Sequence, residues 1–382
     1  HTILSDGKKV VFKELSAEDF KRKCGQKDLE GNLYLQIWEE LGQPETRAEI
    51  HAQFPKKSIH RRNTGYAVDE LLQTSQFEGT ENFNFCKLLT GSEGTLAFTT
   101  EIKLSLDPLP DPIEIVVAAH FESIHESMKS AQVAMKHPVT AVELMDKIIL
   151  DCTKESIEYS KNRYFVEGDP KAILMIEFRG KTLEEATAKG ESLVADLKGA
   201  GYGYAYPIIE PEKVASAWAL RAAGLGLLGN IPGDPKAVAC IEDTAVDIED
   251  LADYIDELDE ILEAFNQSPV HYAHAGAGEI HMRPILDLKK AEDVEDFYQI
   301  SLASAKLVKK YQGSLSGEHG DGRVRAAFIP LMVGEKNYEL FRRIKFTWDP
   351  SNIFNPGKIV DAAPMNQFLR YEVGMQTPEP ET

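Results

Sequence analysis

The chain reads Ser268-Pro-Val-His-Tyr-Ala-His-Ala-Gly-Ala-Gly-Glu-Ile-His-Met-Arg-Pro-Ile285, and this stretch sets the fold around it. Apolar runs flank Ala275-Gly-Ala-Gly278, whose glycines allow the positive φ that a tight hairpin turn needs. A hairpin brings residues on either side of its turn close together, so His274 and His281 can face one point. The stretch therefore predicts two antiparallel strands that carry two neighbouring imidazoles.

A second glycine-rich loop follows, Gly317-Glu-His-Gly-Asp-Gly322. Its glycines let the backbone approach a ligand closely, and they flank Glu318 and His319. Taken singly, a histidine more often satisfies a local hydrogen bond than binds a metal. Together, the two hairpin histidines and Glu318 can supply the ligands of one divalent ion and leave His319 as a base. The set predicts a site for metal-assisted proton transfer.

Composition restricts the class of protein, and 382 residues suffice for two or three domains. Lysine and arginine number 42 against 62 aspartate and glutamate, and the net charge of −20 argues against nucleic acid or an anionic membrane as the main partner. No apolar run of the sequence is long enough to cross a membrane. The cysteines are widely scattered, which indicates no iron–sulfur or zinc cluster within this chain and favours a reducing compartment. We therefore expect a cytoplasmic protein, with a position at the periphery of a membrane as the alternative. They are Cys24, Cys86, Cys152 and Cys240.

Residues 1–106 combine short strands with helices. Asp6-Gly7 predicts an opening hairpin. Residues 28–49 have a helical pattern that Gly42-Gln-Pro44 interrupts. The stretch 85–104 alternates apolar and polar residues around two glycines and predicts strands.

After the linker Asp107-Pro-Leu-Pro-Asp-Pro112, where we place a domain boundary, strands and helices alternate. We expect an α+β fold in which helices cover one face of a sheet. Beyond residue 324 the chain becomes helical and ends in a polar tail. Strands are expected at residues 113–119, 141–144, 173–178, 203–208, 238–241, 268–272 and 280–285, and helices at residues 183–197 and 248–265 among others.

Five short motifs are weak singly, but their order and spacing are specific. They are Gly91-Ser-Glu-Gly-Thr-Leu96, Val142-Glu-Leu-Met-Asp146, the two-histidine hairpin, Ser316-Gly-Glu-His-Gly320 and Asn355-Pro-Gly-Lys358. Together they resemble the FAD-linked oxidases of the vanillyl-alcohol-oxidase type, in the branch of the D-lactate, glycolate and D-2-hydroxyglutarate dehydrogenases. The resemblance implies residues 1–108 as the C-terminal half of an FAD-binding domain, residues 109–328 as a ferredoxin-like antiparallel-sheet substrate (cap) domain, residues 329–362 as a helical return to the FAD domain, and residues 363–382 as a linker.

The segment Arg61-Arg-Asn-Thr-Gly-Tyr66 looks closest to long family members in which an iron–sulfur module follows the flavin part. His1 falls inside a strand pattern, so we expect a piece of a longer protein without the pyrophosphate loop of the FAD domain. This stretch alone is then expected to bind FAD weakly, and an iron–sulfur cluster to belong to a module beyond it. The residues that the resemblance places against FAD are Gly91, Ser92, Gly94, Thr95 and Asn355. Without the resemblance, residues 91–95 read as a simple β-turn.

The resemblance also assigns roles at the predicted metal site. His274, His281 and Glu318 match the family's metal ligands, for which zinc is the expected ion. His319 matches the catalytic base, in contact with the substrate. Arg221 matches the arginine that binds the substrate carboxylate, a task suited to a bidentate guanidinium. The alternative for Arg221 is a solvated charge on the face of a helix.

The implied reaction is oxidation of a D-2-hydroxy acid, of the D-2-hydroxyglutarate or D-lactate type, to the 2-oxo acid with hydride transfer to FAD. An unidentified electron acceptor is implied as a further partner, and a homo-oligomer is compatible with the sequence. Three alternatives stay open: a redox-neutral flavin transferase of the alkyl-glycerone-phosphate synthase type, a flavin-independent metal hydrolase, and a non-catalytic interaction domain.

The hairpin departs from the family pattern at three positions, where Ala277, Glu279 and Arg283 stand. Arg283 has the same parity as His281 on its strand, so it faces the same side. An arginine there needs a carboxylate partner. We expect this partner to be a dicarboxylic substrate, with Glu279 as the internal alternative.

Overall fold

The computed structural model describes residues 1–154, 156–228 and 233–376, and it also leaves the side chains of residues 225, 227 and 228 undescribed. Contacts group the chain into two units. Unit 1 comprises His1–Lys57, Arg62–Leu106 and Gln312–Phe368, and unit 2 comprises Ser58–Arg61, Asp107–Tyr311 and Leu369–Thr382. Residues 312–328, which the sequence assigns to the cap domain, thus group with unit 1. Among the described helices, none combines the length and apolar character that a membrane crossing requires.

Unit 1 opens with the predicted hairpin. Strands β1 (Thr2–Ile3) and β2 (Lys9–Val10) pair antiparallel, and β3 (Phe98–Thr99) pairs with the other edge of β1. The helical pattern of residues 28–49 is confirmed as two helices that part at Pro44, which has no N–H to continue the first. The helices of unit 1 are α1 (Ala17–Cys24), α2 (Leu29–Gly42), α3 (Pro44–Gln53), α4 (Val68–Leu72), α5 (Cys86–Leu89), the 3-10 turn η3 (Ala326–Phe328), α12 (Ile329–Val333) and α13 (Glu335–Trp348).

An aromatic core joins the first and last segments of unit 1. The fully buried Trp348 at the end of α13 lies 5.4 Å from the ring of Phe12 and 5.2 Å from the ring of Phe85, between centroids. Tyr34 of α2 packs 4.6 Å from Phe85. Such aromatic contacts bury large apolar areas, so they fix α13 against the N-terminal segment.

The prediction of strands over residues 85–104 is wrong for most of that stretch. Residues 86–89 form a helix, residues 91–95 form a tight loop, and only residues 98–99 belong to a strand. Three residues of this loop, Gly91, Glu93 and Gly94, have positive φ, which bends the backbone out of the extended form. The alternation of side chains therefore reflects a loop that packs its apolar residues inward.

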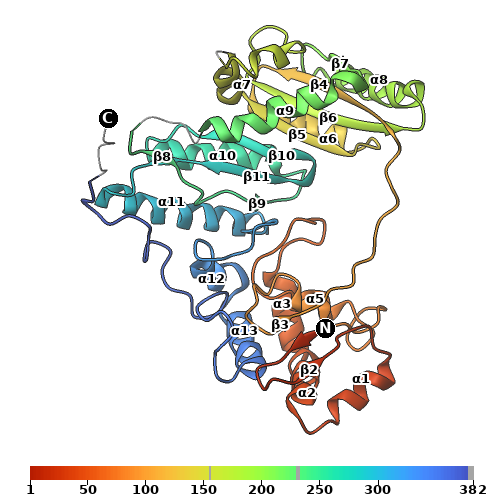
Figure 1. Ribbon diagram of the computed structural model, residues 1–382, viewed down its shortest axis with the longest axis vertical. Helices are drawn as coiled ribbons and strands as arrows, with labels where there is room; N and C mark the ends of the chain where they lie inside the picture. Colours follow the sequence, from red (N-terminus) through yellow and green to blue (C-terminus); the bar gives the residue numbers. More distant parts are fainter. Residues whose placement is uncertain (155, 229–232, 377–382) are drawn as a thin grey trace. The chain divides into compact units, whose positions relative to one another are not determined.

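Unit 2 contains a seven-stranded antiparallel sheet in the order β7-β4-β6-β5-β10-β11-β9, and Figure 1 shows it with its helices. Its strands are β4 (Ile113–Phe121), β5 (Ala141–Asp146), β6 (Ala172–Gly180), β7 (Ile208–Ile209), β9 (Thr244–Ala245), β10 (Val270–His274) and β11 (Glu279–Arg283). A separate pair joins β8 (Lys236–Ala237) to β12 (Ile285–Leu286). The remaining elements are α6 (Ile124–Ala134), α7 (Lys147–Lys154), η1 (Ser160–Arg163), α8 (Leu183–Ala200), α9 (Pro211–Leu228), α10 (Leu251–Ala264), η2 (Ala275–Ala277) and α11 (Ala291–Lys310).

The α+β class is confirmed, but helices cover both faces of this sheet rather than one. Val116 of β4 packs in one core cluster with residues of α7 and α9. Its neighbours Ile115 and Val117 point to the opposite face, where Gly190 of α8 lies close to both. The absence of a Cβ at Gly190 lets α8 approach the sheet closely. Burial on both faces explains why β4, β5 and β6 read as nearly continuous apolar runs.

Two of the predicted strands are wrong, one of them for most of its length and the other entirely. Of residues 203–208 only the last joins β7, and residues 238–241 fall outside any strand, just after β8. The other predicted strands of the sheet and the helices over residues 183–197 and 248–265 are confirmed to within a few residues.

Candidate functional site

The two hairpin histidines lie side by side on one face of the unit-2 sheet. The strand register pairs His274 with Glu279 and Tyr272 with His281, so all four side chains share that face. The imidazole rings of His274 and His281 are 5.1 Å apart between centroids and nearly perpendicular, at 88°. Ligand atoms of His274, Glu279 and His281 all lie within 4.8 Å of one another. Two imidazoles and a carboxylate at this spacing fit a divalent ion such as zinc.

The turn of the hairpin explains how these side chains come together. Residues 275–277 form a 3-10 turn, and Gly278 follows with φ of +69°. A Cβ at Gly278 would lie 2.1 Å from the carbonyl oxygen of Val246, so only glycine fits this turn.

Arg221 of α9 lies against the same face, and it is buried with 9% of its surface exposed. Its guanidinium stacks on the ring of Tyr272 at 4.0 Å from the centroid and contacts the Tyr272 hydroxyl and the carboxylate of Glu143. Burial raises the pKa of Tyr272 despite the neighbouring cation. The alternative that Arg221 is a solvated charge is therefore wrong. Within the described residues, the buried Nε of Arg221 meets no hydrogen-bond acceptor, which is costly unless a ligand supplies one.

Arg283 has an internal acid, and it is Glu242 rather than Glu279, the internal alternative given above. Both Nε and Nη2 of Arg283 lie 2.6 Å from the same oxygen of Glu242. Glu279 is instead fully buried and lies 3.3 Å from Arg61. The expectation that Arg283 meets the substrate stays a prediction.

His271 belongs to the opposite face of the sheet from His274. Its Nε2 lies 2.9 Å from Asp259 of α10, and its Nδ1 lies 3.7 Å from Asp146 at the end of β5. Burial alone would lower the pKa of His271, but the hydrogen bonds and charges of Asp146 and Asp259 outweigh it and raise the pKa to about 9. Asp146 also accepts hydrogen bonds from the backbone N–H groups of His271 and Ile149, so it ties β10 to the start of α7.

In unit 1, residues 91–95 form the loop that the sequence places against FAD. Gly91 and Gly94 have φ of +77° and +67°, and Glu93 between them has φ of +54°. A Cβ at Gly91 would lie 2.4 Å from Oδ1 of Asn63, whereas a Cβ at Gly94 would meet nothing within 4 Å. The backbone at Gly94 is thus open to close approach by a flat cofactor, which fits a flavin contact.

The polar side chains of this loop are largely satisfied within unit 1. The Ser92 hydroxyl donates to the carbonyl of Leu89 at 2.8 Å, and the Thr95 hydroxyl donates to the carbonyl of Ser92 at 2.7 Å. Nδ2 of Asn355 donates to the carbonyl of Glu93 at 2.7 Å. Contacts of these residues with a cofactor would therefore use backbone groups and remaining lone pairs, and their cofactor roles stay predictions.

The loop that carries Glu318 and His319 is hydrogen-bonded to the 91–95 loop. The Glu93 carboxylate accepts hydrogen bonds from the backbone N–H groups of Asp321, at 2.6 Å, and Gly322, at 3.0 Å. Nδ2 of Asn63 donates to the Glu318 carbonyl at 3.1 Å. The side chains of Glu318 and His319 are 37% and 42% exposed and lie 3.6 Å apart. Both belong to unit 1, and their convergence with the hairpin histidines of unit 2 stays a prediction.

Three site residues were not predicted from the sequence. Glu143 contacts His274 and Arg221, although its motif is quoted above only as a family signature. Asp243 is fully buried beside His281 with φ of +76°, a conformation rare for a residue other than glycine. Lys345 is buried and donates to the carbonyl of Thr95 at 2.8 Å, so it stabilises the end of the 91–95 loop. An acidic residue within an apolar strand was the available signal for Glu143.

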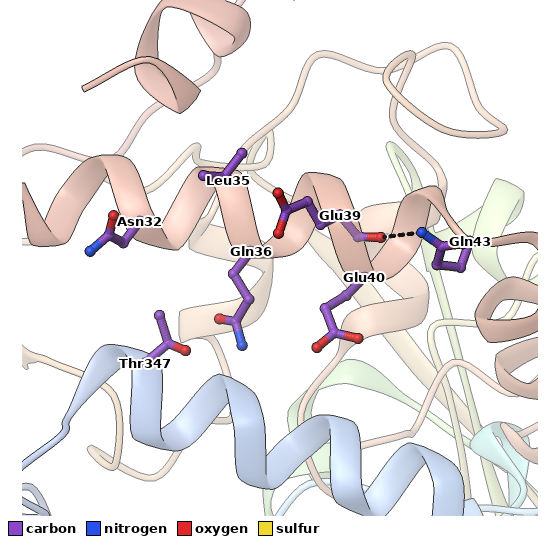
Figure 2. Close-up of a pocket in the computed structure, with 7 residues that line it drawn as sticks. All are labelled: Asn32, Leu35, Gln36, Glu39, Glu40, Gln43 and Thr347. Atoms are coloured by element: carbon purple, nitrogen blue, oxygen red, sulfur yellow. Dashed lines mark hydrogen bonds between the residues drawn. The ribbon is translucent and has the colours of Figure 1, made fainter. Parts of the chain in front are cut away.

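Unit 1 also has a surface groove of about 500 Å³ along α2, shown in Figure 2. Gln36, Glu40 and Thr347 line it, with Asn32, Leu35, Glu39 and Gln43. None of the predicted site residues is among them, so the groove gives the candidate site no support.

Comparisons with known proteins were made for the whole chain. A family described as "FAD linked oxidases, C-terminal domain" matches residues 112–359, more than half of the chain. D-2-hydroxyglutarate dehydrogenase of Pseudomonas putida is 31% identical over 368 residues, which cover 94% of this chain and 35% of that protein. D-2-hydroxyglutarate dehydrogenase of Haemophilus influenzae is 34% identical over 328 residues, covering 82% of this chain and 31% of that protein. The chain thus spans about a third of the length of these relatives.

A solved structure shares the fold. The 4-ethylphenol oxidase of Gulosibacter chungangensis, in its isoeugenol complex, aligns with a TM-score of 0.52 at 12% identity, over 75% of this chain and 60% of that chain. At this identity the likeness concerns the fold alone.

Proposed function

Because the chain belongs to the FAD linked oxidases, C-terminal domain family, we propose that it forms the substrate-binding part of an FAD-dependent D-2-hydroxy-acid dehydrogenase. The names of its relatives support D-2-hydroxyglutarate as the substrate, with D-lactate as the smaller analogue. In this proposal the acid is oxidised to its 2-oxo acid and FAD is reduced.

The observation that carries the proposal is the buried guanidinium of Arg221. It lies on the same face as His274 and His281, and its Nε offers a donor that no described residue accepts. A carboxylate oxygen is the acceptor that suits a buried guanidinium best. A hydroxy acid with its carboxylate at Arg221 would present its hydroxyl group to the histidine pair.

The hairpin would hold a divalent metal, for which we propose zinc. His274 and His281 would be its ligands, with Glu318 as the third and Glu279 as a further carboxylate on the hairpin. A bound ion supplies Lewis acidity that lowers the pKa of a coordinated hydroxyl group. Because Glu143 lies at Nδ1 of His274, coordination of a metal by this ring would use Nε2.

His319 would act as the general base that removes the hydroxyl proton of the substrate. Its side chain is 42% exposed, so a substrate can reach it, and Glu318 beside it can stabilise the imidazolium once the proton arrives. The hydride on the substrate Cα would leave toward FAD, which supplies the two-electron acceptor.

The 91–95 loop would contribute the flavin contacts of this chain. The open backbone at Gly94 and the neighbouring Asn355 would meet the cofactor, while Glu93 and Lys345 hold the loop in shape. Residues 1–108 then act as part of the FAD-binding domain and residues 109–328 as the cap, with an iron–sulfur module and an electron acceptor as further partners.

Anaerobic reduction of the flavin-loaded enzyme by D-2-hydroxyglutarate tests the proposal. We expect loss of the oxidised flavin spectrum with this acid and a slower loss with D-lactate. Replacement of Arg221 by Met should reduce kcat/KM by the equivalent of about 2–5 kcal/mol, since a charge-assisted pair is lost. The matched control is Arg179→Met, because Arg179 of β6 forms its ion pairs with Glu114 of β4 and Glu177 of its own strand, away from the histidine pair. Equal effects of both substitutions would refute the assignment of Arg221.

A further inference from the structure

The side chain of Glu143 links the two functions proposed for the unit-2 face. It extends from β5, is 15% exposed, and lies between the imidazole of His274 and the guanidinium of Arg221. Its two oxygens lie 3.0 Å and 2.9 Å from Nδ1 of His274, and one of them also contacts Nη2 of Arg221. One carboxylate therefore touches the metal-ligand candidate and the carboxylate-binding candidate at once.

The contact with His274 fixes which ring nitrogen carries a proton. A carboxylate that forms an ion pair with a guanidinium, as Glu143 does with Arg221, accepts hydrogen bonds, so Nδ1 of His274 is the donor in this contact. Nε2 of a neutral His274 is then the nitrogen with a lone pair, and a lone pair is what a metal needs. Metal-binding histidines commonly donate their second N–H to a carboxylate, which orients the ring and raises its basicity.

The contact with Arg221 serves a second purpose. A buried guanidinium without a counter-charge is costly, and Glu143 supplies the counter-charge while Tyr272 covers the flat face of the group. Neutralisation of Arg221 alone would account for an acid at this position. It would not require both oxygens to lie within hydrogen-bond distance of the His274 ring.

Building on the function proposed above, we infer that Glu143 is a positioning residue that sets the tautomer of His274 for metal binding and holds Arg221 for the substrate carboxylate. Its loss changes the affinity for metal and the grip on the carboxylate together, although Glu143 touches neither ligand itself.

Metal affinity of the purified chain is the first test, with Co²⁺ as a spectroscopic probe and Zn²⁺ in competition. Replacement of Glu143 by Gln should weaken Co²⁺ binding by about 10- to 100-fold, the usual effect of removing the carboxylate partner of a ligand histidine. The control is Glu177→Gln, since Glu177 lies on neighbouring β6 and pairs with Arg179 instead of a histidine. That variant should bind Co²⁺ as the unaltered chain does. Unchanged affinity in Glu143→Gln, with circular dichroism equal to that of the control, overturns the inference.

A second measurement needs no metal and separates this inference from the proposed function. Nitrogen-15 chemical shifts of the His274 ring in the metal-free chain report which nitrogen is protonated. We expect the Nδ1–H form in the unaltered chain and a mixture of tautomers in Glu143→Ala. If Co²⁺ fails to bind any form but the tautomer changes as expected, the metal proposal falls and the positioning role of Glu143 stands. If the tautomer is the same in both forms, the positioning role falls whatever the metal does.

Discussion

The buried His271 should make the stability of unit 2 fall as the pH rises above neutrality. Its imidazole lies between Asp146 and Asp259, whose interactions outweigh the effect of burial and raise its pKa from 6.5 to about 9. A raised folded pKa means that the folded state binds the proton more tightly than the unfolded state. The stabilisation is therefore fully present below the unfolded pKa of 6.5 and is lost as pH rises through about 9. At about 1.4 kcal/mol for each pKa unit, the change amounts to about 3 kcal/mol.

Urea denaturation followed by tryptophan fluorescence, to which Trp218 of unit 2 contributes, can measure this loss. We compare the unaltered chain with His271→Gln at about pH 6 and about pH 10, because other groups titrate in the same interval and cancel in the difference. The free energy of unfolding of the unaltered chain exceeds that of His271→Gln, and this difference should shrink by about 3 kcal/mol between the two pH values. His125→Gln is the control, since His125 pairs with Asp256 of α10 but is 43% exposed. A difference between His271→Gln and the unaltered chain that does not change with pH would refute the reasoning.

Three further substitutions test other contacts. Gly278→Ala should weaken Co²⁺ binding and destabilise unit 2 by about 1–3 kcal/mol in urea denaturation, because the turn needs positive φ; wild-type affinity would contradict this. Arg283→Ala should lower kcat/KM for D-2-hydroxyglutarate and D-lactate by the same factor if Glu242 is its working partner, whereas a larger loss on the dicarboxylate would put the guanidinium at the substrate. Lys345→Met should destabilise unit 1 by about 3–5 kcal/mol, because it leaves the buried Asp349 without its cation; a change below about 1 kcal/mol in thermal denaturation would show that Asp349 is stabilised by its backbone donors alone.

The part of the fold that the sequence predicts is the part with strong local signals. The apolar runs at residues 113–119, 141–144 and 173–178 form the centre of the sheet, where both faces are buried and no other structure suits such runs. Residues 85–104 carry a similar alternation, yet residues 86–95 form a helix and a loop and only residues 98–99 form a strand, because the positive φ values at positions 91, 93 and 94 interrupt the extended backbone. Glycine permits that bend without specifying it, so the pattern alone favoured a strand.

The site divides in the same way. The hairpin histidines could be predicted because a glycine turn brings near neighbours of the sequence together. Glu143 could not, since it lies 131 residues before His274 and only the order of strands in the sheet places β5 beside β10. Likewise, the acid that pairs with Arg283 is Glu242, which directly follows residues 238–241, where the sequence wrongly predicts a strand.

The loop that carries Glu318 and His319 should behave as a unit held by two side chains, Asn63 and Glu93. Glu93 accepts from backbone N–H groups at one end of the loop, and Asn63 donates to the Glu318 carbonyl at the other. Replacement of either Asn63 or Glu93 by Ala releases one end of the loop and weakens the contact at the other end. The second substitution then lowers the free energy of unfolding by less than it would in the unaltered chain. A double-mutant cycle should show a coupling of about 0.5–3 kcal/mol, read from urea denaturation followed by tryptophan fluorescence, to which Trp348 of unit 1 contributes. Glu101, an exposed residue of unit 1 outside this loop, provides the comparison, and Glu101→Ala should add to Asn63→Ala without coupling. Additivity of the Asn63 and Glu93 substitutions to within about 0.3 kcal/mol would show that each end of the loop is held independently.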